Sequence, residues 1–151
     1  MIKRVLDPNE FKKLIDDMSE LFKKEDAPHG HALVTHNKES IKANFSHPAV
    51  LAWDFFVWGN LSNEKFDAMI AFYKNKDPKF GENMFCEFLW LSKNPKIGYQ
   101  LFREAKDFAR DHGFKFIVMN TVVKNPSHEK LKSFYQNLGF LKDSETYIAK
   151  L

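Results

Sequence analysis

Residues 85–99 read Phe-Cys-Glu-Phe-Leu-Trp-Leu-Ser-Lys-Asn-Pro-Lys-Ile-Gly-Tyr, and the chain is organised around this stretch. Its apolar and aromatic first part predicts a strand that ends at Ser92. A short Lys-Asn-Pro-Lys turn follows, and the apolar spacing from Ile97 to Arg110 predicts a helix. A helix that starts directly after a strand offers backbone N–H groups and the positive end of its dipole. Both suit an anionic group, above all a phosphate.

The composition indicates one soluble globular domain. The chain has 151 residues, of which 44% are hydrophobic and 28% charged, enough to bury a sizeable core. With 16 Phe residues, the core and any ligand groove should be aromatic. The net charge of +3 is spread along the chain, which argues against a dedicated nucleic-acid binder. The mild basic balance alone motivates a third, weaker hypothesis of a nucleic-acid-associated module.

Cys86 is the single cysteine, which excludes an intramolecular disulfide and a cysteine-based zinc site. Its aromatic neighbours favour a buried, unreactive thiol over a nucleophile. The sequence begins without the long apolar region of a signal peptide, and no stretch approaches the length of a membrane span. We therefore expect a cytoplasmic protein that does not act on membranes.

The first part of the chain predicts a strand, two helices and a three-stranded antiparallel meander. Asp7 and Pro8 form a helix start, and apolar residues recur at helical spacing to about Lys24. Gly59-Asn60 and Ser62-Asn63 supply turn residues between strands. The predicted strands cover 2–6, 50–58, 66–73 and 84–91, and the predicted helices cover 8–24 and 38–45.

The second part predicts alternating strands and helices. His112-Gly113 ends the helix that begins at Ile97, and a buried strand is expected over 114–123. Asn125-Pro126 opens another helix that Gly139 stops, and one or two strands follow over 140–151. The order β-α-α-β-β-β-α-β-α-β predicts a single α/β domain (mixed α+β sheet) over 1–151. Its central, mostly antiparallel sheet is flanked by helices.

Two local motifs and this element order resemble the GNAT superfamily of acyl-CoA-dependent N-acyltransferases over essentially the whole chain. Ser133-Phe134-Tyr135-Gln136-Asn137-Leu138-Gly139-Phe140 is similar to the family's Phe-Tyr-x-x-x-Gly-Phe ending of its fourth helix. The family's Gln/Arg-x-x-Gly-x-Gly/Ala motif falls on residues 93–98. There Gly98 matches, Lys93 stands for the leading arginine, and Lys96 replaces the first glycine.

The resemblance implies that this turn holds the pyrophosphate of coenzyme A through the backbone amides of residues 96–99, that is Lys96, Ile97, Gly98 and Tyr99. Pro95 has no N–H and Lys96 adds bulk, so the turn offers fewer donors than the family's glycine loop. Lys93 and Lys96 add positive charge in return. The alternative for this stretch is a capped helix start with no ligand.

The resemblance also implies two catalytic residues. Tyr135 matches the helix tyrosine that many family members place near the coenzyme A sulfur, where a phenol of pKa about 10 can protonate a thiolate. The alternative is that Phe134 and Tyr135 only pack the helix onto the sheet. Glu87 is the candidate general base, whose apolar neighbours would raise its pKa, and the alternative is an exposed strand residue.

Strand alternation predicts that Cys86, Phe88 and Trp90 share one face, and that Glu87, Leu89 and Leu91 share the other. By resemblance, the backbone of Leu89, Trp90 and Leu91 pairs with the pantetheine amides, and bulging there frees an N–H as an oxyanion donor. Many relatives carry an Asn seven residues before the tyrosine; here that position is His128, and Asn125 is the candidate cap or pantetheine contact.

His29, His31 and His36 form a histidine-rich segment after the first helical region. A third ligand at metal-site spacing is missing, so a solvated loop is favoured and no metal is expected. By resemblance, this segment and Trp53, Phe55 and Trp58 could border the acceptor groove, although aromatic residues there are otherwise ordinary core.

The sequence therefore predicts an N-acetyltransferase that uses acetyl-CoA and attacks directly in a ternary complex. Its acceptor is a small-molecule amine or a peptide or protein amine, and the protein is a monomer or homodimer without a nucleic-acid partner. The alternative is a catalytically inactive GNAT-like binding or structural module of phage or bacterial origin, motivated by the altered turn.

Overall fold

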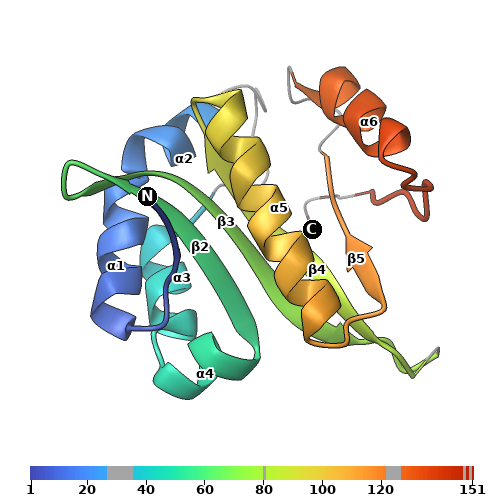
Figure 1. Ribbon diagram of the computed structural model, residues 1–151, viewed down its shortest axis with the longest axis horizontal. Coiled ribbons are helices and arrows are strands. Elements are labelled where there is room, and N and C mark those ends of the chain that lie inside the picture. The colour runs from blue at the N-terminus through green and yellow to red at the C-terminus, as the bar shows by residue number, and fades with distance from the viewer. Residues whose placement is uncertain (27–35, 80, 122–126, 148, 150) are drawn as a thin grey trace.

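The computed structural model describes residues 1–26, 36–79, 81–121, 127–147, 149 and 151. It contains a single five-stranded sheet with helices on both faces, which confirms the predicted mixed α/β class (Figure 1). The elements are β1 (Ile2–Arg4), α1 (Pro8–Asp17), α2 (Ser19–Asp26), α3 (Lys38–Phe45), α4 (Pro48–Trp53), β2 (Phe55–Ser62), β3 (Lys65–Lys76), β4 (Asn83–Ser92), α5 (Pro95–Asp111), β5 (Phe116–Val118) and α6 (His128–Asn137).

The strands lie in chain order, β1-β2-β3-β4-β5. Neighbours from β1 to β4 are antiparallel, so the predicted meander is confirmed. β5 is parallel to β4, and α5 supplies the crossover that a parallel pair requires. The β3–β4 pairing runs from Ala68 to Lys76, whereas β5 pairs only with Met84–Cys86.

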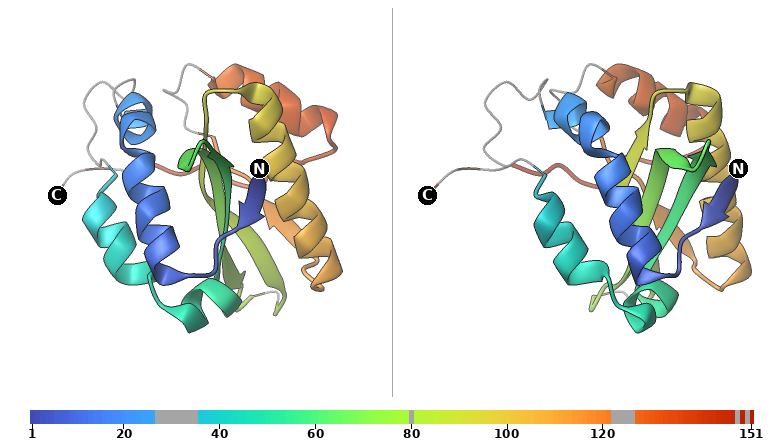
Figure 2. Two further views of the ribbon diagram at one scale, coloured as in Figure 1. Left: turned by 60° about the vertical axis from the view of Figure 1, so that its left-hand side comes forward. Right: turned by 90° about the vertical axis from the view of Figure 1, so that its left-hand side faces the viewer.

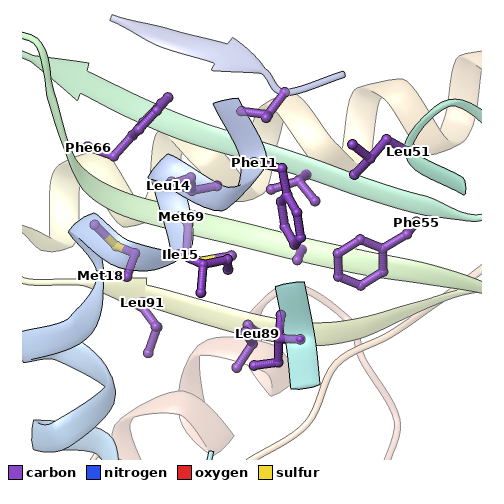
Figure 3. Packing of buried hydrophobic residues seen from close by; sticks show 14 of the residues in the cluster. Phe11, Leu14, Ile15, Met18, Leu51, Phe55, Phe66, Met69, Leu89 and Leu91 are labelled. Carbon is purple, nitrogen blue, oxygen red and sulfur yellow. The ribbon is translucent and has the colours of Figure 1, made fainter. Parts of the chain in front are cut away.

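Two hydrophobic clusters hold the helices on the sheet. Figure 2 shows the sheet nearly edge-on, with α1 and α3 on one side and α5 on the other. The first cluster fills the space under the N-terminal helices and includes Phe11, Leu14, Phe55, Met69 and Leu89 (Figure 3). The second packs α5 on the opposite face, with members Phe56, Ile70, Phe72, Phe85 and Phe102. Both clusters are rich in phenylalanine, as the composition predicts.

The N-terminal half differs from the prediction in two places. The helix predicted over 8–24 is divided at Met18, which ends α1 with a non-helical backbone before α2 begins. The strand predicted over 50–58 begins only at Phe55, because Pro48–Trp53 form α4. His47 caps α4: its Nδ1 accepts a hydrogen bond from the Ala49 N–H at 3.1 Å, and Pro48 occupies the first helical position. A helix start thus overrides the strand propensity of Val50–Trp53.

Of the predicted turn residues, Gly59 and Asn60 are wrong, because both lie inside β2. Asn63 is confirmed, since the reversal occurs at Asn63 and Glu64, which both have positive φ. Gly59 is required by packing instead: a Cβ there would lie 2.7 Å from a ring carbon of Phe66.

The C-terminal half is less regular than predicted. Of the strand expected over 114–123, residues 114–121 are described, and within them only Phe116–Val118 (β5) form a strand; Phe116 is 52% exposed and not buried. Among the described residues after Gly139, none belongs to a strand, so the one or two final strands are not found there. α6 begins after Ser127, while Asn125 and Pro126 lie outside the described residues. Gly139, with φ +84°, follows the end of α6 as predicted.

Candidate active site

The site predicted around β4 lies where β4 and β5 stop pairing. Beyond Cys86, no described strand continues along this edge of β4. Asn120, just after β5, bridges the start of the gap: its backbone N–H donates to Glu87 Oε2 at 2.8 Å, and its Nδ2 donates to the Glu87 carbonyl at 3.3 Å. None of the described strands therefore pairs with the backbone edge of β4 from Phe88 to Ser92 on this side.

A β-bulge at Phe88 changes which residues share a face. Ala71 pairs with Leu89 and Phe72 pairs with Glu87, so Phe88 is an extra residue in β4. Phe88 packs with Leu89 and Leu91 on the first cluster, while Trp90 packs on the second. The predicted alternation is therefore wrong: Glu87 shares the face of its partner Phe72, toward α5, and not that of Leu89.

Glu87 is a partly buried carboxylate with an unusual environment. Burial raises its pKa to about 7; the Asn120 N–H opposes this shift, and the negative charge of Glu25 adds to it. A carboxylate with a pKa near 7 exchanges a proton readily at neutral pH, as a general base must. The raised pKa agrees with the prediction for Glu87, although the side chain lies on the sheet face opposite to Leu89 and not on the same face.

Tyr135 reaches the same place from α6, which lies beside β5 at the end of the sheet where α5 begins (Figure 1). Its side chain is 8% exposed, and its hydroxyl donates to the Asn120 carbonyl at 3.2 Å. Burial, followed by the negative charge of Glu87, raises the pKa of Tyr135. The two candidate catalytic residues therefore flank one residue, Asn120. No motif marks Asn120 in the sequence.

The start of α5 offers fewer free amides than a glycine loop. Asn94 caps the helix, with its Oδ1 accepting from the Lys96 N–H at 3.0 Å and its carbonyl accepting from the Gly98 N–H at 2.9 Å. Pro95 has no N–H, and Tyr99 lies inside the helix. Within the described ranges, the Ile97 N–H is the remaining first-turn donor without an acceptor. The side chains of Lys93 and Lys96 are exposed beside it.

Gly98 is buried beneath the end of β4. Its carbonyl accepts a hydrogen bond from Trp90 Nε1 at 3.2 Å, and a Cβ would stand 3.4 Å from the Ser92 Cβ. Trp90 stacks on Phe102, and Phe134 of α6 contacts both Trp90 and Tyr99. Through these aromatic contacts, α6 packs against the start of α5. The side chains of Leu89 and Leu91 are buried in the first cluster, so only their backbone lies at the open edge.

The remaining predicted site residues fall in several places. Asn125, His29 and His31 lie outside the described residues. His128 Nδ1 is 3.1 Å from Thr121 Oγ1, and His36 Nδ1 is 2.6 Å from Asp26 Oδ1. Across the residues that the structure describes, no group of three or more His, Cys, Asp or Glu side chains is placed to hold a metal ion.

The aromatic residues proposed to border an acceptor groove do not share one surface. Phe55 is buried in the first cluster and Trp58 in the second, on opposite faces of the sheet, so both are core residues. Trp53, at the end of α4, is 71% exposed. Cys86 is buried, and burial raises the pKa of its thiol, which fits the expected unreactive cysteine.

Comparison with solved structures supports the GNAT resemblance at the level of the fold. An aminoglycoside acetyltransferase from an uncultured soil metagenomic sample superposes with a TM-score of 0.68 at 14% identity, over 100% of this chain and 97% of the other. The ribosomal-protein-alanine N-acetyltransferase of Brucella melitensis biovar Abortus gives 0.66 at 11% identity, over 100% and 99%. An acetyltransferase of Trypanosoma brucei gives 0.66 at 11% identity with the same coverage.

No protein-family model and no curated protein matches the sequence. The chain thus has the fold of GNAT-type acetyltransferases, and its sequence identity to these three structures is only 11–14%. None of its described helices has the length and apolar character needed to cross a membrane.

Proposed function

We propose that this protein is an acyl-CoA-dependent N-acyltransferase that transfers the acetyl group of acetyl-CoA to an amine by direct attack in a ternary complex. The observation that carries the proposal is the arrangement of Glu87 and Tyr135 on the two sides of Asn120, beside an open strand edge. An acid–base pair next to unpaired backbone is what acyl transfer from a thioester to an amine requires.

The chain offers groups for each part of the donor. The unpaired backbone of Phe88–Ser92 suits the amides of pantetheine, as an added strand pairs with a sheet edge. Lys93, Lys96 and the Ile97 N–H suit the pyrophosphate. When bound, acetyl-CoA supplies the thioester carbonyl that the amine attacks.

Glu87 and Tyr135 have distinct proton roles in this proposal. Glu87, with a pKa of about 7, accepts a proton from the ammonium form of the acceptor, which leaves the neutral amine. Tyr135 remains protonated at neutral pH because its pKa is raised, and its hydroxyl donates to the departing sulfur. Asn120 positions both groups through its own N–H and carbonyl.

The acceptor in this proposal is an amine on a small molecule or on a peptide or protein. The names of two structures with this fold, an aminoglycoside acetyltransferase and a ribosomal-protein-alanine N-acetyltransferase, define a first panel. Turnover of acetyl-CoA with an aminoglycoside, a peptide that begins with alanine and a simple diamine would separate these classes.

A catalytically inactive module is the second candidate, favoured by one observation. The N–H groups of Lys96 and Gly98 already donate to the side chain and the carbonyl of Asn94. Few backbone donors are therefore left to bind a phosphate. Such a module would fold as the acetyltransferases do and would show no turnover with any acceptor in the panel.

Calorimetric titration with acetyl-CoA tests the proposal. We expect micromolar binding that weakens about tenfold (about 1.4 kcal/mol) in Lys96→Glu, because the charge next to the phosphates is reversed. Lys12→Glu, on the exposed face of α1, is the matched control and should bind as the parent does. Gly98→Trp should abolish binding, but Gly98 is buried, so its fold must be checked by circular dichroism. Absence of binding at millimolar acetyl-CoA would sink the enzyme proposal.

A further inference from the structure

A cavity of about 430 Å³ lies at the other end of α5 from the candidate active site. It opens between β1, α4 and the last turn of α5, at the end of the sheet where α4 is seen in Figure 1. Gly98 and His112 delimit the two ends of α5, on the order of 20 Å apart at about 1.5 Å rise per residue. The described lining of the cavity includes none of Glu87, Asn120 and Tyr135, so the cavity is separate from the candidate active site.

Aromatic side chains form much of the cavity wall. Phe56, Phe108 and Phe114 contribute rings from β2, from α5 and from the segment after it, and exposed Trp53 stands at the rim. Phe56 lies 5.3 Å from Phe108 and 5.7 Å from Phe114, measured between ring centroids. The volume is within the range of about 300–1,000 Å³ typical of small-molecule sites.

Arg4 supplies a cation that no carboxylate of the described residues neutralises by an ion pair. Its Nη2 donates to the carbonyls of Leu51 and Ala52 at 3.3 and 3.1 Å, which fixes the guanidinium at the end of α4. Its Nε is buried without a hydrogen-bond partner. The guanidinium carbon lies 4.4 Å from the centroid of the Phe108 ring. Nη1 remains available, since none of the described residues accepts from it.

The charges around Arg4 are unequal on its two sides. Among the described residues, the cavity is lined by the basic side chains Arg4 and Lys74, with His112, and by no acidic side chain. A second hollow of about 380 Å³ shares Arg4, Phe108 and His112 and is also lined by Lys3 and by three acidic residues, Glu104, Asp107 and Asp111. Lys74 Nζ lies 3.7 Å from Asp54 Oδ1, and this ion pair is exposed and therefore weak. The described lining of the first cavity therefore favours an anion more than that of the second does.

We propose that this cavity binds a small aromatic carboxylate. The ring would pack among Trp53, Phe56 and Phe108, where edge and offset contacts between aromatic rings are favourable. The carboxylate would accept from Nη1 of Arg4 and from Lys74 Nζ, and so neutralise the unpaired guanidinium. This binding does not depend on the acyltransferase proposal, because it uses none of that site's residues.

Calorimetric titration of the full chain with naphthoate, and with naphthamide as its neutral analogue, tests the proposal. We expect naphthoate to bind at least tenfold more tightly than the amide. Lys74→Gln should weaken naphthoate about fivefold and leave the amide unchanged, whereas Trp53→Ala should weaken both. Lys12→Gln, on exposed α1, is the matched control and should change neither.

Lys74→Gln and Trp53→Ala both change exposed side chains. They leave in place the hydrogen bonds by which Arg4 of β1 holds the end of α4, so neither variant should unfold the protein. The proposal is overturned if naphthoate does not bind at millimolar concentration to the folded protein. Equal affinity for the acid and the amide also overturns it, as does binding that neither Lys74→Gln nor Trp53→Ala weakens.

Discussion

The two edges of β4 differ sharply in how they are paired. Toward β3, the ladder runs the length of the strand and lies between two buried clusters. Toward β5, it pairs only at Met84–Cys86, after which Asn120 links Glu87 to Tyr135. One strand thus serves as the centre of the core on one edge and as the wall of a candidate active site on the other. Substitutions on the two sides should separate stability from activity.

The largest expected effect is on the closed side, at Phe72. This fully buried ring stacks on Phe85 with centroids 4.2 Å apart. Phe72→Ala should lower the free energy of unfolding by about 3–5 kcal/mol, because it loses apolar burial and leaves a cavity. Urea denaturation measures the change. A loss under about 1 kcal/mol would mean that this side is not the stabilising core.

On the open side, Tyr135→Phe should separate activity from stability. Turnover should fall about a hundredfold, equivalent to about 2.7 kcal/mol, since the proton donor is removed. Loss of the hydrogen bond to Asn120 should cost only about 1 kcal/mol of stability. The acetyl-CoA dissociation constant should be unchanged. Tyr147→Phe, which removes an exposed hydroxyl that donates to Glu145, is the control; unchanged turnover in Tyr135→Phe would remove Tyr135 from the mechanism.

Glu87 should make stability depend on pH in an unusual direction. Its pKa is raised from 4.5 to about 7 in the folded protein, so the folded state binds the proton more tightly than the unfolded state. Stability should therefore be greatest below pH about 4.5 with respect to this group, and fall by about 1–3 kcal/mol as pH rises to about 7.

Glu87→Gln should remove this component, which denaturation at several pH values would reveal. The same variant should abolish the rise of turnover with pH near 7, because the proposed base is gone. A parent protein whose Glu87 titrates at an ordinary carboxylate pH, followed by NMR, would contradict both expectations.

The smallest expected effect is at the start of α5. Asn94→Ala removes a cap and should cost about 1 kcal/mol of stability. It also releases the Lys96 N–H, so acetyl-CoA affinity should change by no more than about threefold. Asn37→Ala is the matched control, because Asn37 caps α3 in the same way through the Ser40 N–H. It should cost similar stability and leave affinity unchanged; a large affinity loss in Asn94→Ala alone would show that the cap organises the phosphate site.

Local signals predicted much of the fold. Asp7, Pro8 and Glu10 mark the start of α1, and Asp7 indeed accepts from the Glu10 N–H at 2.8 Å. The β2–β4 meander follows from aromatic, β-branched runs divided by polar turns. Where prediction was wrong, a neighbour decided the outcome. Val50–Trp53 read as a strand, but His47 and Pro48 start a helix there.

For the candidate site, the sequence indicated which residues to consider but not how they are arranged in space. Tyr135 and Glu87 could be chosen from the motif and the strand, and the structure places them on either side of Asn120. That link depends on where β5 ends, which no local pattern encodes. Alternation likewise assigned Glu87 to the wrong face, because a bulge at Phe88 interrupts the two-residue period.

This extra residue also determines which change of length β4 can accept. Deleting Phe88 would restore a regular ladder with β3, in which Glu87 still lies opposite Phe72 and Leu89 still lies opposite Ala71. Every remaining residue would keep its face, and the deletion would cost the packing of the Phe88 ring on the first cluster. In an evolutionary comparison, we therefore expect some relatives to keep a carboxylate here and to lack the inserted residue. Other insertions and deletions should accumulate in the turns of the sheet.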